Sequence, residues 1–109
     1  MADIINELDN ILQARLDADP ESSYVASLYA GGTGEILKKI GEEATELVIA
    51  GLSTDKQAIV HESADLLFHT LVLLVHNGLS AADLLAELER RQGQSGLDEK
   101  RKRSNKNNK

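Results

Sequence analysis

The stretch from Ala58 to Val75 places two carboxylates inside a segment that is otherwise apolar on nearly every side. A helix of this composition is normally buried in a protein interior. Glu62 and Asp65 lie three residues apart, so a helix presents both side chains on one face. Buried carboxylates require a cation, a hydrogen-bond donor or a proton. The fold must therefore bring such a partner to this face.

A second acidic face precedes it, on the segment that starts at Lys38. Glu42, Glu43 and Glu46 lie on one side of a helix, and Lys39 joins that side. Like charges at this spacing repel by roughly 0.2–0.5 kcal/mol per pair. Alone, such a group is usually a solvated helix face. Two groups, joined by one short loop that makes their helices antiparallel neighbours, favour a site for a hard cation such as Mg²⁺, which takes oxygen ligands.

The length of 109 residues predicts one domain with a modest core. The absence of cysteine excludes disulfides, thiolate nucleophiles and cysteine metal ligands, and it fits a reducing compartment. The acidic, amphipathic N-terminus is unlike a signal peptide. The longest apolar run, Leu71 to Val75, is too short to span a bilayer. We therefore expect a soluble cytoplasmic protein without a membrane partner.

The net charge of −6 is divided unequally along the chain. Residues 100–109 hold six of the 12 basic residues and none of the 18 acidic ones, so the rest of the chain carries 6 − 18 = −12. An acidic body does not suit a nucleic-acid backbone, and we expect no nucleic-acid partner. An acidic body suits a protein that binds cations and contacts phosphates through the bound cations. We expect a helical domain over residues 1–96 and a polar, basic, solubilising tail over 97–109.

Apolar residues recur at helical spacing in five segments, which predicts an all-α, small helical bundle. The expected helices cover about residues 3–16, 22–30, 34–52, 55–76 and 81–92. The third helix has a predicted core face of Ile36, Leu37, Ile40, Ala44, Leu47, Val48 and Gly51. The fourth helix is apolar on more faces than one small subunit covers, so we expect a homodimer.

Local signals mark the ends of these helices. The Gly31-Gly32 pair is expected to stop the second helix, and its spacing matches neither common phosphate-binding loop. Thr54 and Gln57 have the spacing of a capping box at the start of the fourth helix. Ser80 is the expected N-cap of the last helix.

Two histidines, His69 and His76, fall near the face that holds Glu62 and Asp65. A histidine there has several possible roles, as a metal ligand, a phosphate contact, a general acid or a core residue bonded to a neighbouring carbonyl or carboxylate. The core role is favoured, because carboxylate-rich sites select hard metals that need no imidazole.

These residues resemble a known family. The segments Glu43-Ala-Thr-Glu46 and Glu62-Ser-Ala-Asp65 are similar to the E-x-x-E…E-x-x-D signature of the MazG-like all-α nucleotide pyrophosphatases. The blocks S-Y at residue 23, K-I-G-E-E-A-T-E at 39, E-S-A-D-L-L-F-H-T-L-V-L-L at 62 and G-Q-S-G-L-D-E-K at 93 resemble the phosphoribosyl-ATP pyrophosphatase family within that group. The resemblance covers about residues 3–103, nearly the whole chain.

The resemblance implies hydrolysis of phosphoribosyl-ATP to phosphoribosyl-AMP and pyrophosphate, with Mg²⁺, in the second step of histidine biosynthesis. It also implies a homodimer of helical subunits. The implied metal ligands are Glu43, Glu46, Glu62 and Asp65; the implied catalytic residues are Glu42 and Glu43; the implied substrate-binding residues are Lys38, Lys39 and His69. Glu42 would be a further ligand or the base that activates water.

The resemblance also has departures. Basic residues are common in the family where this chain has Ser27, Gly31 and Glu35. A phosphate contact at these positions must then come from elsewhere, for example from the Lys100–Arg103 run. Two alternative functions stay open: a house-cleaning pyrophosphatase of ordinary or damaged nucleoside triphosphates, and a non-catalytic helical dimerisation module whose acidic groups face water.

Overall fold

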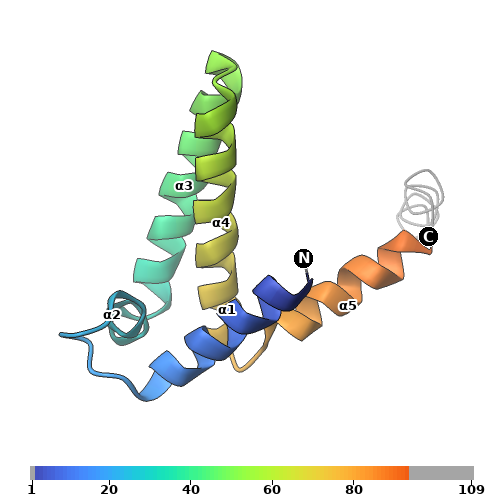
Figure 1. Ribbon diagram of the computed structural model, residues 1–109. Helices are drawn as coiled ribbons and strands as arrows, with labels where there is room; N and C mark the ends of the chain where they lie inside the picture. Colours follow the sequence, from blue (N-terminus) through green and yellow to red (C-terminus); the bar gives the residue numbers. More distant parts are fainter. Residues whose placement is uncertain (1, 94–109) are drawn as a thin grey trace, which may run out of the picture.

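The computed structural model describes residues 2–93, which contain five α-helices and one short 3₁₀ helix (Figure 1). In chain order they are α1 (Ala2–Ala14), the 3₁₀ helix η1 (Arg15–Asp17), α2 (Tyr24–Gly31), α3 (Thr33–Ser53), α4 (Lys56–His76) and α5 (Ala81–Gln92). The prediction of an all-α protein is confirmed, with helix ends close to those expected. The expected domain boundary at residue 96, the tail over 97–109 and the Lys100–Arg103 run lie outside the described residues.

Helices α3 and α4 form a long antiparallel hairpin (Figure 1). The turn between them is short: Thr54 adopts the left-handed conformation, with a φ of 61°, and Asp55 is extended. The Asp55 carboxylate accepts a hydrogen bond from the Ala58 amide at 3.2 Å, so Asp55 is the N-cap of α4. The predicted capping box between Thr54 and Gln57 is wrong, because a left-handed residue lacks the extended backbone that an N-cap requires.

The change of direction between α2 and α3 occurs at Gly32. Its φ of 88° and ψ of 179° lie in a region that is essentially restricted to glycine. The Gly32 amide donates to the Leu28 and Tyr29 carbonyls at 3.2 and 3.1 Å, which closes α2. Gly32 is also the first flanking residue of α3. The predicted helix stop at this glycine pair is confirmed, and its position directs α3 away from α2.

The capping prediction at the start of α5 is confirmed as well. Ser80 is extended and precedes the helix, and the Asp83 carboxylate accepts a hydrogen bond from its amide at 2.9 Å. Helix α5 is further tied to α1, because the Asp9 carboxylate accepts from the Ala81 amide at 2.8 Å. These bonds hold the last helix across the base of the hairpin.

The core lies where α1, α2 and α5 pack against the lower part of the α3–α4 hairpin (Figure 1). Its largest fully buried side chains are Leu12, Ile36, Leu71, Val72 and Val75. The upper part of the hairpin has no such cover within residues 2–93.

The predicted core face of α3 is therefore only partly correct. Ile36 is fully buried, but Leu37 and Val48 are 49% and 62% exposed in the single chain. Further apolar side chains near the hairpin tip are exposed too, among them Ile49, Leu52 and Val60. The three short helices reach only the base of the hairpin, so periodicity alone did not distinguish a face that contacts them from one that does not.

Among the described residues, α4 is the one helix long and apolar enough to cross a membrane by length and composition. Its C-terminal half lies in the protein core. Leu71, Val72 and Val75 supply much of the buried core, and Glu62 and Asp65 interrupt its apolar surface.

Candidate metal centre

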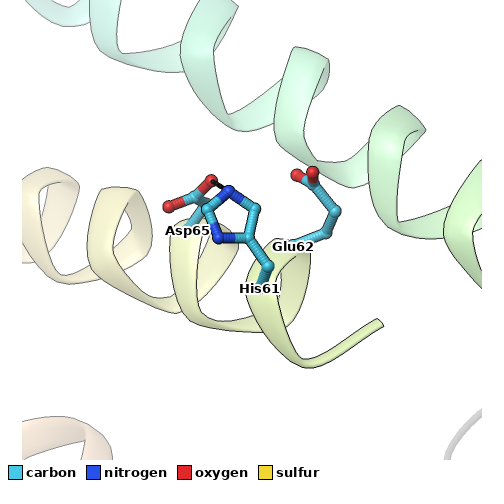
Figure 2. A group of neighbouring side chains, drawn as sticks. All are labelled: His61, Glu62 and Asp65. Atoms are coloured by element: carbon cyan, nitrogen blue, oxygen red, sulfur yellow. Dashed lines mark ion pairs between the residues drawn. The ribbon is translucent and has the colours of Figure 1, made fainter. Parts of the chain in front are cut away.

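The hairpin brings the two acidic segments together. Glu43 and Glu46 of α3 and Glu62 of α4 each offer a carboxylate oxygen, and these three oxygens lie within 4.8 Å of one another. A second group joins Glu62 to His61 and Asp65 within the same 4.8 Å limit (Figure 2). Glu62 belongs to both groups. The four carboxylates predicted to be metal ligands therefore lie in one connected cluster.

Two oxygens of this cluster are buried without a hydrogen-bond partner in the described part of the chain: Oε2 of Glu43 and Oε2 of Glu62. A buried anionic oxygen without a donor is unfavourable, because it loses water without a replacement. Close packing raises the pKa of Glu62 above its usual 4.5, and the neighbouring Glu46 and Glu43 raise it further, whereas His61 lowers it. A cation between these oxygens would remove both costs, so the cluster is chemically suited to bind a metal.

His61 was not selected from the sequence. Its Nε2 lies 3.2 Å from Oδ2 of Asp65, the contact drawn as a dashed line in Figure 2, while Glu62 reaches toward α3. The spacing of four residues between His61 and Asp65 is the signal that could have identified this pair. The imidazole side chain is 70% exposed and orients Asp65 at the edge of the cluster.

The remaining candidates on α3 lie beside the cluster. The Nζ of Lys39 is 3.8 Å from a carboxylate oxygen of Glu42, and both side chains are partly exposed. Glu42 belongs to neither of the two groups, because it points about 100° around the helix from Glu43. Lys38 is exposed one position earlier. Positive charge therefore lies next to the carboxylates on the same helix.

His69 is buried, with an exposed fraction of 6%, and both of its ring nitrogens have partners. Nδ1 lies 2.9 Å from the backbone carbonyl oxygen of Asp65, and Nε2 lies 2.9 Å from the hydroxyl of Tyr24. A carbonyl only accepts, so the proton is on Nδ1, and Nε2 accepts from Tyr24. This arrangement fits the core role for His69 and leaves it no ring nitrogen for a phosphate. His76 instead stacks on Tyr29, with ring centroids 5.9 Å apart.

A hollow of about 250 Å³ opens beside the cluster between α3 and α4. Its walls include Glu46 and Glu62, together with apolar side chains such as Ile49 and Ala58. The carboxylates of the cluster are therefore reachable from solvent, and a ligand that contacts them meets a largely apolar wall on the side of the hairpin tip.

Comparison with known proteins gives a consistent result. The family model described as phosphoribosyl-ATP pyrophosphohydrolase matches residues 5–92. A phosphoribosyl-ATP pyrophosphatase of Methylibium petroleiphilum is 55% identical over 97 residues, which are 89% of this chain and 81% of the relative. Proteins of the same name from Hydrogenovibrio crunogenus and Geobacter sulfurreducens are 53% and 54% identical, covering 94% and 92% of this chain and 94% and 99% of the relatives. The matched range includes every residue of the carboxylate cluster.

Proposed function

Because the chain belongs to the phosphoribosyl-ATP pyrophosphohydrolase family, we propose that it hydrolyses phosphoribosyl-ATP to phosphoribosyl-AMP and pyrophosphate in histidine biosynthesis. It is thus a hydrolase that cleaves a phosphoanhydride bond. The observation that supports this proposal best is the cluster of Glu43, Glu46 and Glu62, in which two buried oxygens have no partner among the described residues. Such a cluster is what a metal-dependent pyrophosphatase requires.

The proposed cofactor is Mg²⁺, held by Glu43, Glu46, Glu62 and Asp65. The donor set fits it, since these are hard oxygen ligands from two facing helices and Mg²⁺ binds through a few carboxylates while sharing its shell with phosphates. When bound, Mg²⁺ supplies positive charge against the phosphate oxygens as the anhydride bond breaks.

The chain's own residues supply the other parts of the reaction. A water attacks phosphorus in line with the departing pyrophosphate, and one carboxylate accepts its proton. Glu42 is suited to this role, because it lies next to Glu43 and outside both groups of the cluster. Lys39 and Lys38 place positive charge beside the carboxylates, where they contact substrate phosphates. No serine or histidine nucleophile is needed.

The subunit is proposed to act as a homodimer in the cytoplasm. Val48, Ile49, Leu52 and Val60 are 60% to 81% exposed near the tip of the hairpin. An apolar surface of this kind is characteristic of a subunit interface, and a second copy of the hairpin would cover it by symmetry. Sedimentation or light scattering of the purified protein measures the assembly directly.

The test of the reaction is phosphorus NMR of the purified protein with phosphoribosyl-ATP, with and without Mg²⁺, and with ATP as a second substrate. Pyrophosphate and phosphoribosyl-AMP should appear only with phosphoribosyl-ATP and metal. Cleavage of ATP instead would indicate a house-cleaning pyrophosphatase. No cleavage of either substrate, by a folded protein that does not respond to Mg²⁺, would indicate a dimerisation module.

A variant links the reaction to the cluster. Asp65→Asn keeps the shape of the side chain but removes its charge, so it should nearly abolish turnover and leave the helical content unchanged. Asp83→Asn, on α5, is the matched control, because Asp83 caps a helix that lies away from the cluster. Normal turnover by Asp65→Asn would remove Asp65 from the mechanism.

A further inference from the structure

A second, larger hollow, with a volume of about 480 Å³, is lined by Tyr24. It forms where η1 and the segment before α2 meet α4. Its walls include Arg15, Ser22, Ser23, Tyr24 and Phe68. The hollow therefore combines one guanidinium, two hydroxyls and two aromatic rings, which is a different chemistry from that of the carboxylate cluster.

The two sites are neighbours along α4. Phe68 follows Asp65 by three residues and Glu62 by six, so it lies about 4.5 Å and 9 Å further along the helix axis. Phe68 also contacts His69 edge to face, with ring centroids 5.2 Å apart. Along the axis of α4, the hollow therefore lies within about two helical turns of the carboxylates.

Tyr24 lines the hollow and is 52% exposed, and its hydroxyl donates to Nε2 of His69 at 2.9 Å. Burial raises the pKa of the Tyr24 hydroxyl, Lys39 opposes this effect, and Glu43 and Asp65 add to it. The hydroxyl thus lies within electrostatic reach of the carboxylate cluster, while the same residue lines the hollow.

One cationic side chain lines the hollow among residues 2–93, that of Arg15. No Lys or Arg occurs between Arg15 and Lys38, and Lys38 and Lys39 lie on α3 beside the carboxylates. Ser23 already accepts from the Ala26 amide, which leaves its own hydrogen to donate.

The neighbouring acidic side chains do not enter the hollow. The residues that line it include none of Asp17, Asp19 and Glu21, and the Asp19 carboxylate accepts from the Glu21 amide at 2.9 Å. An anionic group in the hollow therefore meets donors and a guanidinium rather than carboxylates.

We propose that this hollow binds the phosphoribosyl group of the substrate, with Arg15 on its terminal phosphate and Tyr24 and Phe68 against its sugar. The inference rests on the proposed function. Phosphoribosyl-ATP is anionic at both ends: the triphosphate chain belongs at the metal cluster, and the 5′-phosphate at the other end needs a separate cation. Guanidinium binds phosphate through two parallel hydrogen bonds. Because ATP lacks the phosphoribosyl group, binding in this hollow would favour phosphoribosyl-ATP over ATP as the substrate.

His69 acts on this site as a positioning residue. Its protonated Nδ1 is fixed by the Asp65 carbonyl, and its Nε2 fixes the Tyr24 hydroxyl. These two hydrogen bonds hold the Tyr24 hydroxyl in place. The Asp65 carbonyl thus positions His69, while the Asp65 side chain belongs to the carboxylate cluster.

The test is the steady-state kinetics of Arg15→Gln with phosphoribosyl-ATP and saturating Mg²⁺. Loss of charge-assisted hydrogen bonds to a phosphate should raise KM roughly 10- to 100-fold, while kcat changes little because the metal cluster is intact. Ribose 5-phosphate should inhibit the wild-type protein competitively and the variant much less. Inorganic triphosphate, which reaches only the cluster, should inhibit both equally.

Arg91→Gln is the matched control, because it removes the same charge on α5 and Glu87 keeps its bonds to Arg90. Circular dichroism shows whether Arg15→Gln is folded; if it is not, Arg15→Lys, which keeps the charge but loses the paired hydrogen bonds, should still raise KM several-fold. An unchanged KM in a folded Arg15 variant, with equal inhibition by ribose 5-phosphate, overturns the inference. A wild-type protein inactive on phosphoribosyl-ATP would instead refute the proposed function itself.

Discussion

Glu43→Gln should make the metal-free protein more stable while it destroys the reaction. In the absence of metal, the Glu43 carboxylate lies with Glu46 and Glu62 inside a 4.8 Å group, and one of its oxygens is buried without a described partner. Glutamine keeps the shape of the side chain and removes one negative charge. Its amide NH₂ group can also donate hydrogen bonds to the neighbouring carboxylates. A carboxylate that only stabilised the fold would give the opposite result.

The size of the stabilisation can be bounded for the Glu43–Glu46 pair. Measured repulsion between helix neighbours gives a lower bound of roughly 0.2–0.5 kcal/mol. Coulomb's law at 4.8 Å and an effective dielectric constant of 20 gives roughly 3.5 kcal/mol, which water around the exposed Glu46 side chain screens to a smaller value. A gain on the order of 1 kcal/mol is expected, which raises Tm by roughly 4–8 °C in a domain of this size.

Bound Mg²⁺ should make the wild-type protein more stable than the Glu43→Gln variant, the reverse of the order expected without metal. For the wild-type protein, Mg²⁺ at 100 times its Kd adds about 2.7 kcal/mol. The variant should gain much less at the same concentration. Turnover should fall at least about 100-fold, since loss of even an outer partner of a metal ligand costs 10- to 100-fold. The assay is thermal unfolding at one fixed protein concentration, in EDTA and across a Mg²⁺ titration, together with release of pyrophosphate.

The control is Glu89→Gln, an equivalent change on the exposed surface of α5, which should alter neither Tm nor turnover appreciably. The reasoning fails if Glu43→Gln lowers Tm in EDTA. It fails equally if the variant keeps both the wild-type response to Mg²⁺ and the wild-type rate.

Three further outcomes are expected. If Glu42 accepts the proton of water, Glu42→Gln lowers kcat roughly 10²- to 10⁴-fold but keeps the Mg²⁺-dependent rise in Tm; loss of that rise would make Glu42 a metal ligand. Gly32→Ala should destabilise the protein by about 1–3 kcal/mol in urea unfolding, because its φ of 88° strains any residue with a Cβ; an unchanged midpoint would contradict this. Burial raises the pKa of Tyr29 to about 12, so the unfolded chain loses this proton first, and wild-type stability should fall as pH rises from 10 to 12 more steeply than that of Tyr29→Phe; parallel curves would exclude Tyr29.

Local sequence information determined the helices and several of their ends. Helix ends depend on residues within one turn, and Gly32 and Ser80 occupy the predicted positions. The failure at Thr54 is also local: two residues in succession could cap α4, and the tight turn that reverses the chain forces Thr54 into a left-handed conformation. Which of two adjacent candidates becomes the cap depends on the geometry of that turn.

The faces of the hairpin could not be predicted in the same way. Val48 and Ile36 both belong to the predicted apolar face of α3, yet Ile36 is fully buried and Val48 is 62% exposed. Periodicity identifies an apolar face but not the element that covers it. In this chain the cover ends at the base of the hairpin, because α1, α2 and α5 are short (Figure 1).

The sequence by itself determined that Glu43 and Glu46 share one face and that Glu62 and Asp65 share another, because helical spacing alone places them so. Only the tertiary structure decided that the two faces meet within 4.8 Å, since the register of α3 against α4 is set by the turn that joins them. The pairing of His69 with Tyr24, 45 residues away, was likewise decided by the packing of α2 on the hairpin. Helical spacing determines which residues share a face of one helix, and packing determines which of these faces come into contact.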